Sequence, residues 1–217
     1  VFDLLEIEEM QVAQGALRQG ALYDLLDREQ PETDLRTATV NALMQRFAVD
    51  TAHAERVAAT ACALFRQAAA PGSERAERKL EWAAKLHEVG CRISHSDYHR
   101  HGAYILDNTD AAGFALPELH RLGILVLGQR GKVRKLEADL SDASFALQLI
   151  CLRLAVALCH ARRAPDITEM QLRMEPGTFT LKIPSRWPQA FPQSAHLLQE
   201  EMVAWQKTPW ELRVQAD

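Results

Sequence analysis

The chain has 217 residues, of which 47% are hydrophobic and 25% are charged, and its formal net charge at pH 7 is -4. This composition fits a globular protein of one domain, or of one domain plus part of another, and it excludes a disordered chain. The acidic average also excludes a protein that coats nucleic acid, so any affinity for a polyanion must come from local clusters of Lys and Arg.

The cysteines, the apolar runs and the first residues bear on metal binding, on cellular location and on whether the chain is part of a longer protein. The four cysteines stand in apolar stretches and form no C-x-x-C pair, so neither a zinc ribbon nor a redox motif is indicated. The longest apolar run, residues 145–158, is interrupted by Gln148 and Arg153 and is too short to span a membrane. We therefore predict a cytoplasmic protein without membrane contact. The chain begins at Val1 without a leader, which favours a piece of a longer protein.

Residues 1–33 predict a short unit separate from the rest. Helix-like residues surround a β-like run at residues 9–13, and Gly15 and Gly20 follow it at positions that suit close backbone packing. The charged residues around Pro31 indicate a linker into the next unit.

Residues 34–164 have the pattern of an all-helical domain. Apolar residues recur at helical spacing and predict about six helices, with a turn at residues 70–73 and a stop at Gly90. The last of them is a long buried helix from about residue 144 to about residue 161. Asp50 is placed to cap the second of these helices. On the second and third helices the apolar face includes a histidine, so we expect His53 and His87 to point inward.

Residues 165–217 change to a strand-like pattern. Residues 167–174 and 178–183, with Pro176-Gly177 between them, predict a β-hairpin, followed by a helix at residues 193–206 and a third strand at residues 210–214. The predicted fold is therefore mainly α, with a small α+β appendage at the carboxyl end. Four large aromatic residues of this appendage are candidates for its core or for a subunit interface: Trp187, Phe191, Trp205 and Trp210.

Histidine and carboxylate residues on separate predicted helices are candidates for a metal site. Such groups converge inside helical bundles to hold ions that activate water for phosphoester chemistry. The candidates are His53, the pair His87-Glu88, and the histidines that follow, His95, His99 and His101.

This arrangement resembles the HD superfamily of metal phosphohydrolases, whose pattern is a His, a His-Asp pair and a distant Asp. His53 matches the first position, Glu88 stands in place of the paired Asp, and Val156 stands where the final Asp is expected. The resemblance implies an HD-like helical domain with a degenerate metal site at His53, His87, Glu88 and His101. Two interpretations stay open: a buried hydrogen-bonded cluster, or a site that still binds metal.

Three strings resemble the carboxy-terminal half of the exopolyphosphatase and guanosine pentaphosphate phosphohydrolase (Ppx/GppA) family. They are residues 15–20 (GALRQG), 82–90 (WAAKLHEVG) and 99–106 (HRHGAYIL). The resemblance implies that residues 1–33 end an upstream actin-like domain, and that actin-like domains with Mg²⁺ hydrolyse a terminal phosphoanhydride of polyphosphate or pppGpp. It also implies a homodimer, with no catalytic residue and no bound cofactor in this part of the enzyme.

If the resemblance holds, the helical domain is expected to hold the polyphosphate chain. Four cations fall within six residues at 130–135, a spacing that suits a repeating anion but also a solvated surface loop. The candidate polyphosphate-binding residues are Arg100, Arg121, Arg130, Lys132, Arg134 and Lys135. Three functions stay open: an accessory domain that binds the phosphate chain and dimerises, an autonomous HD-type metal phosphohydrolase, or a dimerisation module without phosphate affinity.

Overall fold

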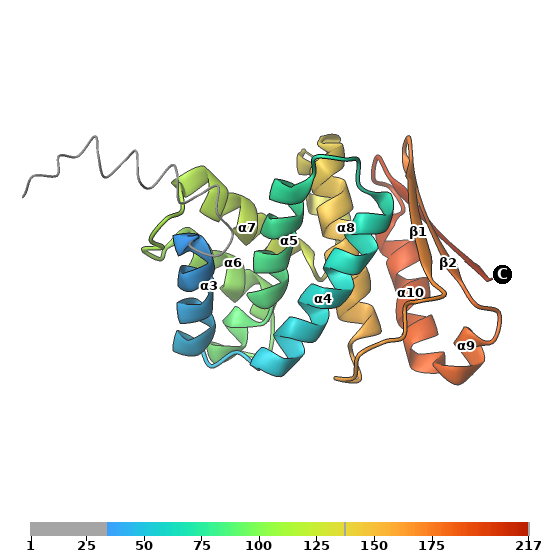
Figure 1. Ribbon diagram of the computed structural model, residues 1–217, viewed down its shortest axis with the longest axis horizontal. Helices are drawn as coiled ribbons and strands as arrows, with labels where there is room; N and C mark the ends of the chain where they lie inside the picture. The colour runs from blue at the N-terminus through green and yellow to red at the C-terminus, as the bar shows by residue number, and fades with distance from the viewer. Residues whose placement is uncertain (1–33, 137, 217) are drawn as a thin grey trace, which may run out of the picture.

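The computed structural model describes residues 34–136 and 138–216, which form a helical body and a smaller α+β appendage (Figure 1). The predicted fold class, mainly α, is confirmed. Residues 1–33, with the predicted end of an upstream domain, lie outside the described residues.

The helices are α3 (Leu35–Arg46), α4 (Thr51–Ala68), α5 (Glu74–Lys85), α6 (Tyr98–Asp107), α7 (Leu116–Gly128), α8 (Ala143–Leu158), α9 (Trp187–Ala190) and α10 (Pro192–Trp205). The strands are β1 (Gln171–Glu175), β2 (Thr178–Ile183) and β3 (Glu211–Ala216), and short 3₁₀ helices are η1 (Val89–Arg92), η2 (Val133–Leu136) and η3 (Asp139–Ser141).

Aspartate side chains cap three helices of the body. Asp34 accepts a hydrogen bond from the Arg36 backbone N–H at 3.0 Å, and Asp50 accepts one from the His53 N–H at 3.0 Å, as predicted for α4. Asp142 caps α8 in the same way. These carboxylates satisfy N–H groups that the first turn of a helix leaves without a partner. The caps therefore set where α3, α4 and α8 begin.

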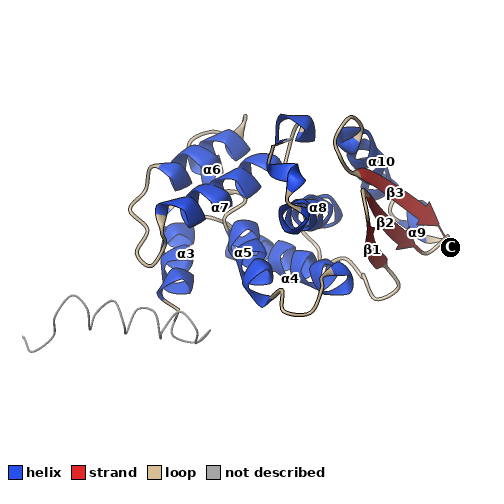
Figure 2. Cartoon of the chain, turned by 90° about the horizontal axis from the view of Figure 1, so that it is seen from above, coloured by secondary structure: helices blue, strands red, loops and turns tan. Residues whose placement is uncertain are grey.

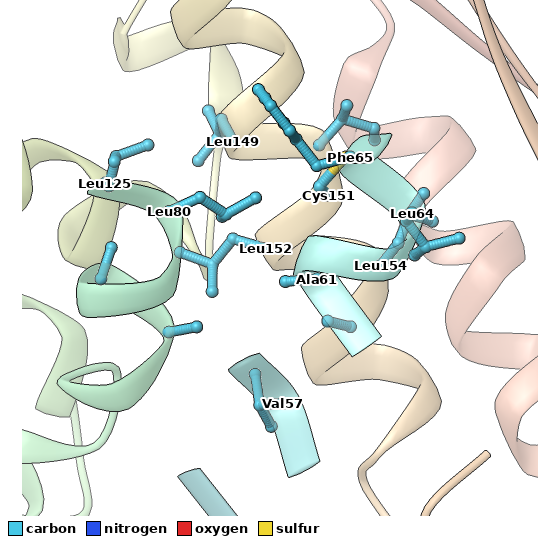
Figure 3. Close-up of a cluster of buried hydrophobic side chains, with 14 of the residues drawn as sticks. Val57, Ala61, Leu64, Phe65, Leu80, Leu125, Leu149, Cys151, Leu152 and Leu154 are labelled. Carbon is cyan, nitrogen blue, oxygen red and sulfur yellow. The ribbon is translucent and has the colours of Figure 1, made fainter. Parts of the chain in front are cut away.

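Helix α8 is the centre of the hydrophobic core. Nearly all of its residues are buried, and it lies between the α4–α5 pair and α10 (Figure 2). Figure 3 shows Leu149 and Leu152 of α8 meeting Leu80 of α5 and Phe65 of α4. Because α8 is buried on all sides, its sequence is apolar around the whole helix rather than along one stripe.

The appendage is a three-stranded sheet of order β1-β2-β3 that packs against α10. Strands β1 and β2 form the predicted antiparallel hairpin, with Gly177 in its turn at a φ of 73°, and β3 pairs parallel to β2. The side chains of β2 alternate, so Phe179 and Leu181 face inward. There Phe179 stacks on Trp210 with ring centroids 4.6 Å apart.

Most of the aromatic side chains of the appendage are buried in its own core. Trp187, Trp205 and Trp210 are buried, whereas Phe191 is 51% exposed. The Trp210 indole donates a hydrogen bond to the Leu140 carbonyl at 2.9 Å, which joins the appendage to the body. A subunit interface at this end stays a prediction.

Three predicted boundaries are wrong. Helix α5 ends at Lys85 instead of continuing to the predicted stop at Gly90, because residues 86–88 form a turn that leads into η1. The first strand begins at Gln171 instead of residue 167, because residues 167–170 form a turn in which the Met170 N–H bonds the Ile167 carbonyl. Helix α8 ends at Leu158 instead of residue 161, since the chain turns back there with Arg162 in a left-handed conformation. Within the part of the chain that the structure describes, no helix has the length and apolar character that crossing a membrane requires.

Candidate functional site

The structure brings His53, His87 and Glu88 together where α4 begins and α5 ends. His53 lies in the first turn of α4, and His87 and Glu88 follow the end of α5. One possible ligand atom from each residue lies within 4.8 Å of those of the other two. The Nε2 atom of His53 is 4.0 Å from Oε1 of Glu88, and the two imidazole centroids are 5.4 Å apart. The fourth predicted ligand, His101 on α6, does not join this cluster, which is defined on the described residues.

Hydrogen bonds to the backbone fix the orientation of His87. Its Nδ1 lies 2.7 Å from the Ala84 carbonyl, so Nδ1 carries the proton and donates, which leaves Nε2 as the acceptor of the ring. The side-chain amide of Gln129 donates to the backbone carbonyl of His87. Gln129 lies at the end of α7, and no sequence pattern predicts its contact with His87, because the contact depends on how α7 packs against α5.

Both histidines of the cluster are neutral at pH 7. Burial lowers the pKa of His87 to about 4, and burial also lowers the pKa of His53, although the Glu88 carboxylate opposes the shift. Neutral imidazoles can accept hydrogen bonds or bind a metal ion. The imidazole pair therefore does not by itself distinguish a hydrogen-bonded cluster from a metal site.

The pKa of His87 predicts a loss of stability in mild acid. Its folded pKa lies below the ordinary value of 6.5, so the unfolded chain takes up the proton first. This contribution is complete above about pH 6.5 and is lost as the pH falls towards about 4, by about 3 kcal/mol for His87. Urea unfolding at several pH values measures it. His87→Gln should flatten the pH dependence of the free energy of unfolding. A free energy of unfolding of the wild type that stays constant between about pH 6.5 and about pH 4 would contradict the lowered pKa of His87.

Arg162 completes the cluster, and sequence reasoning missed it. Its guanidinium lies 2.7 Å from Oδ2 of Asp50, and 3.2 and 3.5 Å from the two carboxylate oxygens of Glu88. The residue follows α8, where the predicted helix boundary was wrong. Its φ of 54° places it in the left-handed region, which turns the chain back towards α4. No sequence pattern predicts a contact between residues so far apart along the chain.

Val156 stands at the position expected for the final HD aspartate, and its side chain lines a cavity that His53, His87 and Glu88 do not line. Val156 lines a cavity of about 440 Å³ together with Gln129, Arg130, Arg153 and Glu201. It contributes no carboxylate to the histidine cluster. With one carboxylate, which already faces the Arg162 guanidinium, the residues present do not fit the divalent-ion site of an HD enzyme.

The predicted phosphate-binding cations separate into two groups. Arg100 pairs with Asp97 at 3.3 Å. Arg121 pairs with Asp142 at 2.5 Å and stacks over the Phe145 ring at 4.2 Å. These two guanidinium groups already have partners within the fold.

The second group is the basic loop, which we define as Arg130, Lys132, Arg134 and Lys135. All four residues are exposed. Arg130 lies over the Tyr98 ring at 5.6 Å and lines the cavity beside α10. Within residues 34–136 and 138–216, no ion pair to any of the four is found. The loop therefore carries positive charge that its described surroundings do not neutralise.

Residues 35–203 match the family model described as Ppx/GppA phosphatase, domain III. This match covers most of the chain, so the chain belongs to the Ppx/GppA phosphatase family and residues 35–203 correspond to its domain III. The family resemblance that the sequence strings predicted is confirmed.

Similar proteins carry the name guanosine-5'-triphosphate,3'-diphosphate pyrophosphatase. The chain is 33% identical over 220 residues to the protein of that name from Vibrio atlanticus, and 34% identical over 221 residues to that from Aeromonas hydrophila. Each match covers 99% of this chain and 44% of the relative. The match to the Vibrio cholerae protein is 34% identical over 193 residues, 86% of this chain and 38% of the relative. The chain spans less than half the length of these relatives.

Proposed function

We propose that this region is the accessory domain of a cytoplasmic enzyme that hydrolyses the terminal phosphoanhydride of pppGpp or polyphosphate. In this proposal another part of the enzyme, with Mg²⁺, performs the chemistry, and the basic loop holds the phosphate chain of the substrate. The match to domain III and the printed names of the relatives support the class of enzyme. The chain covers 44% of each of those relatives, so more than half of such an enzyme remains to perform the chemistry, and this supports an accessory role for the region.

The observation that carries the proposal is the charge of the basic loop. A phosphate chain is a flexible, repeating anion that needs positive charge and N–H donors without a fixed geometry. Arg130, Lys132, Arg134 and Lys135 offer both, and no ion pair to them is found within the described residues. Arg100 and Arg121 are weaker candidates, because binding phosphate would compete with Asp97 and Asp142.

The alternative is an autonomous HD-type metal phosphohydrolase, which the proximity of His53, His87 and Glu88 favours. Hydrolysis by a bound ion requires ligands that hold the ion and leave a position open for water. Here the single carboxylate of the cluster is shared with Arg162. We therefore favour a region that binds the substrate and does not cleave it.

Neutralising the basic loop is expected to weaken polyphosphate binding. The triple variant K132Q/R134Q/K135Q removes three exposed cations, each contributing about 0.5–1 kcal/mol at a solvated site. Its affinity for polyphosphate, measured by calorimetry at low salt, should fall at least about tenfold.

The matched control removes three exposed cations outside the loop in the variant R163Q/R173Q/K207Q. It has the same net charge as the loop variant and should bind polyphosphate within about twofold of the wild type. Equal losses in both variants would mean non-specific attraction. Wild-type affinity in the loop variant would mean that other residues bind polyphosphate. A wild-type chain that does not bind polyphosphate at all would favour a dimerisation module without phosphate affinity.

A further inference from the structure

We infer that Arg162 supplies, from within the chain, the positive charge that a metal ion supplies to the histidine–carboxylate cluster of HD phosphohydrolases. The cluster is then a metal-free contact between α4, the end of α5 and the turn after α8. This inference concerns a different part of the molecule from the basic loop, so it stands or fails independently of polyphosphate binding.

The first argument is that the guanidinium and an ion would compete for the same oxygen. The oxygen Oε1 of Glu88 is 4.0 Å from Nε2 of His53 and 3.2 Å from a terminal nitrogen of Arg162. A zinc-like ion bound by this carboxylate and imidazole would lie about 2 Å from each ligand atom. It would therefore lie beside the guanidinium, with two positive charges sharing one carboxylate oxygen.

The second argument is that Arg162 joins both carboxylates near the cluster. Its other terminal nitrogen is 2.7 Å from Asp50, the residue that caps α4 and so fixes the first turn that carries His53. Arginine suits this bridge because its planar group can donate to two carboxylates at once. The two carboxylates thus already have a cation.

The third argument is the backbone conformation of Arg162. A φ of 54° is unfavourable for a residue with a Cβ atom, and such a conformation persists where its surroundings require it. The Arg162 N–H bonds the Cys159 carbonyl at 2.8 Å, and this turn directs the side chain to Asp50 and Glu88. In the HD pattern this helix supplies the final carboxylate, whereas here the turn after the helix supplies a cation.

Metal binding to variants of Arg162 tests the inference. Arg162→Gly removes the guanidinium and accepts the positive φ without strain, and Arg162→Gln is a second variant, with a shorter uncharged side chain. The probes are Zn²⁺ alone, measured by equilibrium dialysis near pH 7.5, and Co²⁺, whose absorption reports its ligands. The wild type should bind no stoichiometric ion at the cluster. Arg162→Gly should bind one ion at least about tenfold more tightly, because an adjacent cation no longer repels it.

The control variants separate the cluster from other histidines and cysteines of the chain. Arg163→Gln removes the neighbouring exposed cation and should behave as the wild type. The double variant R162G/E88Q should lose the gained ion, because it lacks the carboxylate ligand. Thermal unfolding of each variant establishes that it is folded.

Two results would overturn the inference. One is a wild-type chain that binds one ion which Glu88→Gln abolishes. The other is a pair of folded variants, Arg162→Gly and Arg162→Gln, that both bind Zn²⁺ no more tightly than the wild type.

Discussion

Replacing Glu201 by leucine is expected to lower the free energy of unfolding by about 3–5 kcal/mol. The Arg153 side chain on α8 is 3% exposed and donates to both oxygens of Glu201 on α10, at 2.6 and 2.8 Å. Without Glu201, the buried guanidinium keeps only the Gly128 carbonyl as a described partner, at 2.6 Å. The loss arises because a buried charge without its counterion is far more costly than the pair. Urea unfolding measures it.

Two comparisons isolate the ion pair from general damage to α10. Glu200, the preceding residue, has a 62% exposed side chain, so Glu200→Leu should change the free energy of unfolding by less than about 0.5 kcal/mol. The double variant R153M/E201L should be more stable than E201L alone, because it removes the buried charge as well. A cost for E201L as small as that for E200L would contradict the account of how the appendage is fixed to the body.

Replacing Gly90 by alanine is expected to destabilise the protein by about 3 kcal/mol or more. A Cβ atom at Gly90 would overlap the Tyr98 carbonyl and lie 2.5 Å from the Gly102 backbone nitrogen. These are backbone atoms of α6, which cannot move aside as the end of a side chain can. Gly90 thus allows the segment that carries His87 and Glu88 to pack closely on α6. Thermal and urea unfolding measure the effect.

The matched control for Gly90 is Gly72. A Cβ atom at Gly72 would meet nothing within 4 Å, but its φ of 84° is unfavourable for alanine. Gly72→Ala should therefore cost only about 1 kcal/mol, from the backbone conformation alone. Equal costs for the two variants would show that close packing at Gly90 does not matter.

Local patterns in the sequence predicted most of the fold. The helical spacing predicted the helices of the body, Asp50 was predicted to cap α4, and Pro176-Gly177 predicted the hairpin. Each of these features depends on residues close together in the chain. The inward positions of His53 and His87 followed from the same spacing, although His87 lies in the turn after α5 and not on the helix itself.

Contacts between distant residues could not be predicted in this way. Arg162 reaches Glu88 across 74 positions of the chain, and Arg153 reaches Glu201 across 48. The sequence also grouped Arg121 with the basic loop, whereas the start of α8 provides Asp142 as its partner. These contacts depend on helix packing, which spacing along a single helix does not specify. They also decide which cations are available to a ligand.

The central claim, that this region binds a phosphate chain, is tested most directly by titrating the wild-type chain with polyphosphate. Calorimetry at about 50 mM and about 200 mM salt compares the affinities. Binding through exposed cations releases counterions, so the affinity should fall at least about tenfold at the higher salt concentration. Binding that is absent at the lower salt concentration, or equal at both, would contradict the proposed function.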